Sequence, residues 1–87
     1  MMGSYKLLVK KSAEKELRAI PKPFLSKISA KIKMLSLQPR PHGCEALSNN
    51  DKHYRLRQND YRIVYTVDDF KNEVIIVKIG HRSDVYK

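Results

Sequence analysis

The sequence predicts an α+β fold of the order β-α-α-β-β-β, with a helical hairpin packed on one face of a small, mainly antiparallel sheet. Between Ser12 and Leu35, apolar residues recur at intervals of three and four, as in two successive amphipathic helices. From His53 to Val67, polar and apolar residues alternate, as in strands with one buried face. The chain has 87 residues, so we expect a single domain spanning residues 1–87.

The first half of the chain is expected to hold one strand and the two helices. Ser4–Lys10 predicts a short strand, and Ser12 is the expected N-cap of the first helix. Pro21 should stop that helix, and Pro23 suits the first residue of the next, where its missing N–H costs nothing. The QPRP segment Gln38–Pro41 should end the second helix.

The second half is expected to form an antiparallel meander. A loop rich in Pro, Gly, Asn and Ser fills residues 38–51. Three strands joined by turns should follow, namely a strand from His53, a strand at Tyr61–Val67 and a strand at Val74–Ile79, with turns at Gln58–Asp60 and Asp68–Asn72. The last strand is apolar on both faces, which suits a central position, and Gly80 should end it.

Composition narrows the classes of partner. Lys and Arg number 18 against 9 Asp and Glu, a net charge of +9, which favours nucleic acid or an acidic protein segment. Alternatively, the positive charge only aids solubility. The single cysteine, Cys44, rules out an intramolecular disulfide and fits a reducing cytosol. No apolar run approaches the ~20 residues of a membrane span, so we expect a cytoplasmic protein without a membrane partner.

Several kinds of site are missing from the sequence. It has no glycine-rich phosphate loop and no GxGxxG, which argues against a nucleotide cofactor. His42 and Cys44 lie close together, but two ligands in a loop fall short of a zinc site. We therefore expect neither a metal nor a small-molecule cofactor.

The two predicted hairpin strands carry an unusual number of cations. Alternation places His53, Arg55 and Arg57 on one strand face, and pairing around the turn can place Arg62 beside them. A bulge in the turn would move one strand's side chains to the other face. The C-terminal tail can return beside the start of the strand at Tyr61–Val67, which would bring Arg82 near Arg62. Arginine binds phosphate bidentately and Tyr or His stacks on bases, which suits RNA, although Arg55 and Arg57 alone would suit a solvated strand face.

Three motifs carry a family resemblance. YRLR at Tyr54–Arg57, DYRIVY at Asp60–Tyr65 and IGHRSDVY at Ile79–Tyr86 resemble the RelE branch of the RelE/ParE toxin superfamily, over nearly the whole chain. The resemblance implies the toxin of a type II toxin–antitoxin system, an mRNA interferase that inhibits translation. Such a toxin is a ribosome-dependent, metal-independent endoribonuclease that cleaves in the A site by attack of a ribose 2′-OH on the scissile phosphate. The implied partners are a cognate RelB-like antitoxin, the ribosome with its RNA, and mRNA.

The resemblance also implies roles for individual residues. Arg57 and Arg62 match positions that contact the scissile phosphate, and Arg82 matches one that assists the leaving group or the charge. Tyr86 matches the C-terminal aromatic that stacks on a base. Arg55 matches a position often held by lysine, the presumed base in some members. A guanidinium cannot usefully accept a proton at neutral pH, so this chain departs from that pattern.

We therefore expect a histidine to take over proton transfer, because imidazole titrates near neutrality. His81, adjacent to Arg82, is preferred over His53. The alternative is that the ribosome and positioning do most of the work and no true base exists. The expected RNA-binding residues comprise a sheet group, Arg55 and His53, and a helix group with salt-dependent affinity for ribosomal RNA, Lys27, Lys31 and Lys33. The helix group could also be a solvated face.

Two other functions remain open. A ParE-like DNA gyrase inhibitor would share the fold without a nuclease site, although it would not need Arg62, Arg82 and Tyr86 together. A catalytically weak relative could instead act mainly as an antitoxin-bound regulator, since the lysine base is absent.

Overall fold

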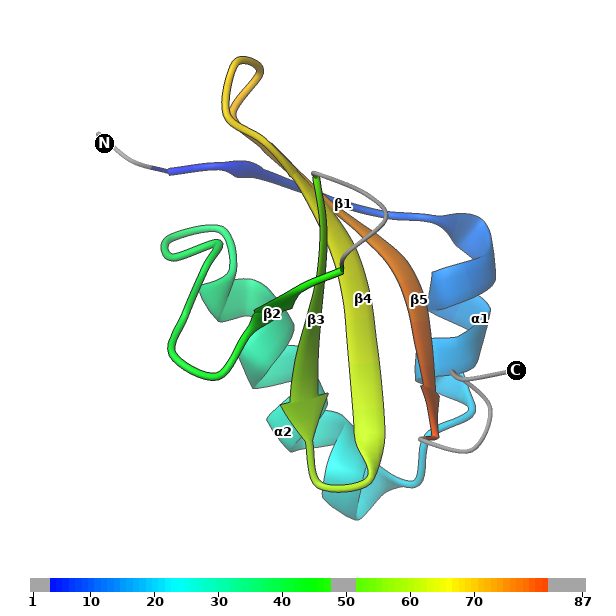
Figure 1. The fold of residues 1–87 in the computed structure, drawn as a ribbon. Helices are drawn as coiled ribbons and strands as arrows, with labels where there is room; N and C mark the ends of the chain where they lie inside the picture. Colours follow the sequence, from blue (N-terminus) through cyan, green and yellow to red (C-terminus); the bar gives the residue numbers. More distant parts are fainter. Residues whose placement is uncertain (1–3, 48–51, 82–87) are drawn as a thin grey trace.

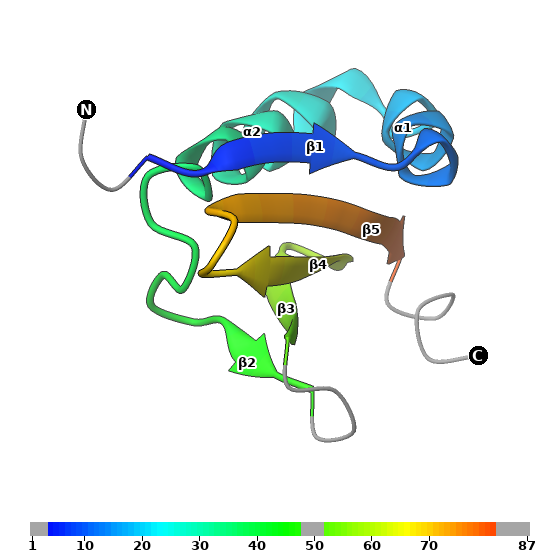
Figure 2. The ribbon, with the colours of Figure 1, turned by 90° about the horizontal axis from the view of Figure 1, so that it is seen from above.

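Two helices pack on a five-stranded sheet in the computed structural model, which describes residues 4–47 and 52–81 (Figure 1). In chain order the elements are β1 (Lys6–Val9), α1 (Lys11–Arg18), α2 (Lys22–Met34), β2 (Glu45–Ala46), β3 (His53–Gln58), β4 (Tyr61–Asp68) and β5 (Glu73–His81). The sheet order is β1-β5-β4-β3-β2, with β1 parallel to β5 and the other pairs antiparallel. Figure 2 shows α1 and α2 together on one side of β1 and β5. The predicted α+β fold is confirmed.

The start of α1 differs from the prediction. Its N-cap is Lys10, without a side-chain capping bond, so the prediction of Ser12 as N-cap is wrong. The backbone N–H of Lys10 still donates to the carbonyl of Ile76 in β5, at 3.0 Å. The carbonyl of Lys10 accepts the N–H of Glu14 at 2.8 Å, so this residue ends the sheet pairing and opens the helix. Strand pairing therefore sets the helix start.

Prolines mark the break between the helices. α1 ends at Arg18, before Pro21, as expected. Pro21 is the N-cap of α2, and Pro23 therefore lies one position later than predicted, within the first turn. Both prolines fall where helical N–H groups have no intrahelical acceptor, so neither interrupts a helix.

The segment predicted as a loop over residues 38–51 contains a strand. β2, at Glu45–Ala46, pairs antiparallel with Arg55 and Tyr54 of β3. Two residues are too few to produce a recognisable alternation. At the other end of the sheet, β5 runs through Gly80 to His81, so the prediction that Gly80 ends this strand is also wrong.

The β3–β4 hairpin fixes the register that alternation left open. Its strands are joined by Asn59 and Asp60 alone, and Asn59 has a φ of 57° in the left-handed region. Asparagine adopts this conformation readily, and two-residue turns of this kind match the twist of the paired strands. No bulge occurs within β3–β4, and Arg57 pairs directly with Arg62.

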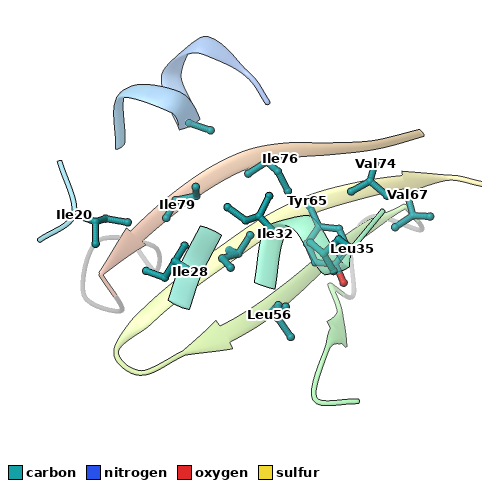
Figure 3. Close-up of a cluster of buried hydrophobic side chains, with 12 residues drawn as sticks. Ile20, Ile28, Ile32, Leu35, Leu56, Tyr65, Val67, Val74, Ile76 and Ile79 are labelled. Carbon is teal, nitrogen blue, oxygen red and sulfur yellow. The ribbon is translucent and has the colours of Figure 1, made fainter. Parts of the chain in front are cut away.

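The core lies between α2 and the sheet (Figure 3). Ile28, Ile32 and Leu35 recur on one face of α2 and its C-terminal turn, and all three are buried. Tyr65 of β4 is fully buried against this stripe, and its O–H donates to the carbonyl of Pro39 at 2.7 Å. This bond ties the segment after α2 to the sheet. Because one sheet face is occupied by the helices, the alternate residues must point away from them.

No helix in the described part of the chain is long and apolar enough to cross a membrane.

Candidate active site

Cationic side chains lie on the sheet face turned away from the core. We call this surface the arginine face and define it by His53, Arg55 and Arg57 of β3 and Arg62 of β4. In the β3–β4 register, Arg55 is opposite Val64 and Arg57 is opposite Arg62. Directly paired residues of antiparallel strands share a face, so the expected grouping agrees with the observed pairing.

Arg57 and Arg62 are directly opposite each other on this face. Arg57 is exposed, whereas Arg62 is only 5% exposed. On its other side Arg62 pairs with Gly80 of β5, which carries no side chain. Like charges directly opposite each other cost roughly 0.2–1 kcal/mol in a sheet. An anion bound above the pair would offset this repulsion, which makes the position suitable for a phosphate.

Glu45 brings a carboxylate to the arginine face. It pairs with Arg55 across β2 and β3, and the Arg55 Nη2 donates to its Oε1 at 2.7 Å. This hydrogen bond lowers the pKa of Glu45, helped by the charge of Arg55 and more weakly by Arg57 and Arg62. The sequence prediction missed Glu45, because nothing in a two-residue strand shows which face its side chains occupy.

His53 shares the arginine face but lies at its far end. It pairs with Thr66, four residues along β3 from Arg57. At the usual strand rise this separation is about 13 Å between backbone positions. Its Nδ1 is buried and has no hydrogen-bond partner among residues 4–47 and 52–81. The structure therefore does not bring His53 next to the arginine pair.

His81, the preferred proton-transfer residue, lies on the opposite face. It pairs with Tyr61, and the two rings meet edge to face with centroids 5.8 Å apart. The ring of Tyr61 in turn lies 5.7 Å from that of Phe24 in α2, on the side of the helices. His81 nevertheless follows Gly80 directly, and Gly80 is the β5 partner of Arg62. Its backbone is close to the arginine pair while its ring points to the other side.

Two other predicted residues, Arg82 and Tyr86, lie outside the described residues. β4 and β5 are paired as far as Tyr61 and His81, so the end of β5 does return beside the start of β4, as expected. The roles of Arg82 and Tyr86 stay predictions.

The three α2 lysines expected to bind ribosomal RNA differ in their exposure. Lys27 and Lys33 are exposed on the helix, whereas Lys31 is partly buried. Lys31 lines a hollow of about 400 Å³ together with Arg57 and Glu45. The structure therefore brings one of the three lysines to the edge of the arginine face.

Within residues 4–47 and 52–81, no three His, Cys, Asp or Glu side chains gather in a way that could hold a metal ion. Cys44 is a partly buried free thiol. The arginine face offers guanidinium groups that can bind an anion, with the carboxylate of Glu45 beside them.

Comparison with known proteins places this geometry in a family. The family model described as "ParE toxin of type II toxin-antitoxin system, parDE" matches residues 7–86. Toxin RelG of Mycobacterium tuberculosis is 35% identical over 34 residues, which are 39% of this chain and 39% of that protein.

Solved structures agree with the family match. The isolated RelE toxin of E. coli has a TM-score of 0.80 and 28% identity, covering 95% of this chain and 92% of that chain. The archaeal RelE–RelB complex from Pyrococcus horikoshii has a TM-score of 0.81 and 25% identity, covering 91% and 96% respectively. Because the family match spans nearly the whole chain and the fold matches RelE, the chain belongs to the RelE/ParE superfamily of type II toxin–antitoxin toxins, as a RelE-like member.

Proposed function

We propose that this toxin is a ribosome-dependent, metal-independent endoribonuclease that cleaves mRNA in the ribosomal A site. A ribose 2′-OH attacks the adjacent phosphorus and the bond to the next 5′ oxygen breaks, which leaves a 2′,3′-cyclic phosphate and a 5′-OH. The observation that carries the proposal is the direct pairing of Arg57 with Arg62 on the sheet face away from the core.

The arginine pair would act on the charge that develops during the reaction. The phosphate carries one negative charge at the start and gains a second as the 2′ oxygen attacks. Two guanidinium groups on the same sheet face can stabilise that extra charge by hydrogen bonding and charge. The cationic fork also matches phosphate oxygens geometrically, which a lysine ammonium would not. No metal ion is required for this step.

Proton transfer is the part of the reaction that the arginines cannot perform. We retain His81 for this role, because it follows the β5 partner of Arg62 and is exposed. The role requires its ring to turn around the end of β5, away from Tyr61. Glu45 is the competing group: its carboxylate lies on the arginine face and can accept a proton, and the hydrogen bond from Arg55 that lowers its pKa also makes it a weaker base.

A RelB-like antitoxin is the proposed inhibitor. The Pyrococcus horikoshii RelE was solved in complex with its RelB. The net charge of +9 on this chain favours an acidic segment of such an antitoxin, which would neutralise the arginine face by covering it.

The experiment that tests the nuclease proposal uses programmed ribosomes with an empty A site and maps mRNA ends by primer extension. Wild type, Arg62→Ala and the matched control Lys71→Ala are compared, together with a reaction that contains mRNA alone. Lys71 is exposed in the turn between β4 and β5, away from the arginine pair. Cleavage within the A-site codon that requires both the ribosome and Arg62 is the expected result. Intact mRNA with folded wild-type protein would reject the proposal.

Inhibition of DNA gyrase is the second candidate, favoured by the family model's description as ParE toxin. A supercoiling assay with purified gyrase separates the two. Loss of supercoiling together with intact A-site mRNA would support gyrase, whereas unimpaired supercoiling would exclude it.

A further inference from the structure

A groove runs along the outer edge of β3, between α2 and the loop that follows it. Two hollows of about 250 and 400 Å³ meet there, and both are lined by Lys31, His42 and Leu56. We call their union the α2–β3 groove. It is open because β2 pairs only with Tyr54 and Arg55, and within the described chain no strand pairs with the outer edge of β3 beyond Arg55.

The backbone of the loop keeps this space clear. Gly43 lines the larger hollow and has a φ of 96°, a conformation that side chains rarely adopt. A Cβ built at Gly43 would meet nothing within 4 Å, so the position faces open space. The side of the loop at Gly43 that borders the larger hollow is therefore unoccupied by neighbouring atoms.

The two ends of the groove differ in chemistry. The smaller hollow adds Met34, Pro41 and the amide of Gln38 to the shared residues, so its surface is mainly apolar, with the polar groups of Lys31, Gln38 and His42 at its border. The larger hollow adds Arg57 and Glu45. The carboxylate of Glu45 is ion-paired with Arg55 at 2.7 Å, so the cations Lys31 and Arg57 dominate this end.

We propose that the α2–β3 groove binds a nucleotide of the RNA that flanks the scissile phosphate, with its base at the apolar end and its phosphate between Lys31 and Arg57. This inference rests on the proposed nuclease function and names its substrate subsite. His42 lines both hollows and can stack on the base, as imidazole does in single-stranded RNA sites.

Continuity with the arginine face favours RNA over an acidic peptide. Arg57 belongs both to the pair with Arg62 and to the lining of the groove. A strand of RNA held by its phosphate at that pair therefore has its next nucleotide within reach of the groove. An acidic peptide would use the cations but would not need an apolar hollow beside the amide of Gln38.

The first test is an NMR titration of the full-length, ¹⁵N-labelled toxin with AMP, UMP and inorganic phosphate separately. We expect the nucleotides to shift amide signals around residues 31, 42 and 56–57 and to bind at least fivefold more tightly than phosphate. Lys31→Ala and His42→Ala should each weaken nucleotide binding at least threefold, and Lys71→Ala should not. If phosphate binds as tightly as the nucleotides, the groove does not bind a base. If the shifted amide signals all come from residues outside the groove, the nucleotides bind elsewhere and the inference is wrong.

An acidic peptide rich in Glu serves as the competing ligand in the same titration. If it binds the groove more tightly than the nucleotides, the groove is a protein-docking surface and the inference is wrong. Because these titrations need no ribosomes, they show whether the groove binds a nucleotide even if the wild-type toxin leaves mRNA intact.

The second test measures cleavage on ribosomes that present different A-site codons. His42→Ala should change the ratio of rates between codons by at least fivefold, with ribosome binding unchanged. If wild type cleaves and both groove variants cleave every codon at wild-type rates, the subsite is refuted while the nuclease proposal stands.

Discussion

Burial predicts that the two paired arginines contribute unequally to cleavage. Arg62 is 5% exposed and Arg57 is exposed, although they face the same position above the sheet. At about 4 Å, a unit charge stabilises an opposite charge by roughly 4 kcal/mol at an effective dielectric constant near 20, but by about 1 kcal/mol in bulk water. Replacing either arginine with alanine removes its share of this stabilisation from the transition state.

Each ~1.4 kcal/mol of lost transition-state stabilisation lowers the reaction rate tenfold. Arg62→Ala should slow single-turnover cleavage about 10³-fold and Arg57→Ala about fivefold. The assay uses saturating toxin on programmed ribosomes, at a temperature where circular dichroism shows each variant to be folded. Arg62→Lys keeps the charge but loses the guanidinium fork, so its rate should lie between those of wild type and Arg62→Ala.

Equal losses for the two alanine variants, or a greater loss for Arg57→Ala, would refute the reasoning from burial. If Arg62→Ala weakened ribosome binding but left the single-turnover cleavage rate unchanged, Arg62 would have no role in the chemical step. Lys71→Ala, on an exposed turn, should retain the wild-type rate and serves as the control for net charge.

Three further predictions concern stability and proton transfer. Tyr65→Phe leaves the buried carbonyl of Pro39 without its 2.7 Å hydrogen bond, which should cost about 1–2 kcal/mol and lower Tm by roughly 4–8 °C per kcal/mol in a thermal melt. Nη2 of Arg40 lies 2.7 Å from Oδ2 of Asp69, and this hydrogen-bonded ion pair holds the pKa of Asp69 below its usual value. The ion pair therefore stabilises the fold above about pH 4, and this stabilisation is lost as the pH falls through the lowered pKa. The urea unfolding midpoint of Asp69→Asn should therefore change less between about pH 5 and 3 than that of wild type. If the two midpoints change with pH in parallel, the ion pair does not contribute to stability. His81→Ala should lower the single-turnover cleavage rate far more than the affinity for the ribosome. An unchanged rate would show that His81 does not transfer a proton, and Glu45 would be tested next.

Much of the fold could be read from periodicity. The apolar stripe at Ile28, Ile32 and Leu35 is buried as predicted, and so are Leu56, Ile63, Tyr65 and Val67 from the alternating segment. Arg62, expected on the polar face, is also buried. The β2 strand could not be found this way, because Glu45–Ala46 spans a single repeat of the two-residue strand pattern, and one repeat shows no periodicity.

The boundaries of elements depended on contacts between distant residues. Ser12 has the chemistry of an N-cap, but α1 begins at Lys11 because Lys10 is still bonded to β5. Gly80 has the chemistry of a strand end, but β5 continues through it because β4 supplies a partner as far as Tyr61. In both cases hydrogen bonding across the sheet overrode local propensity.

By itself, the sequence determined the fold class, the helix and strand faces, and the presence of Arg55, Arg57 and Arg62 on strands, because these follow from local periodicity and charge. Which of these side chains meet depends on contacts between segments that are distant in the chain. The register of a two-residue turn placed Arg57 against Arg62, and the pairing of β5 turned the ring of His81 towards Tyr61. Such proximities are set by strand register and packing between distant segments, which no single stretch of sequence encodes.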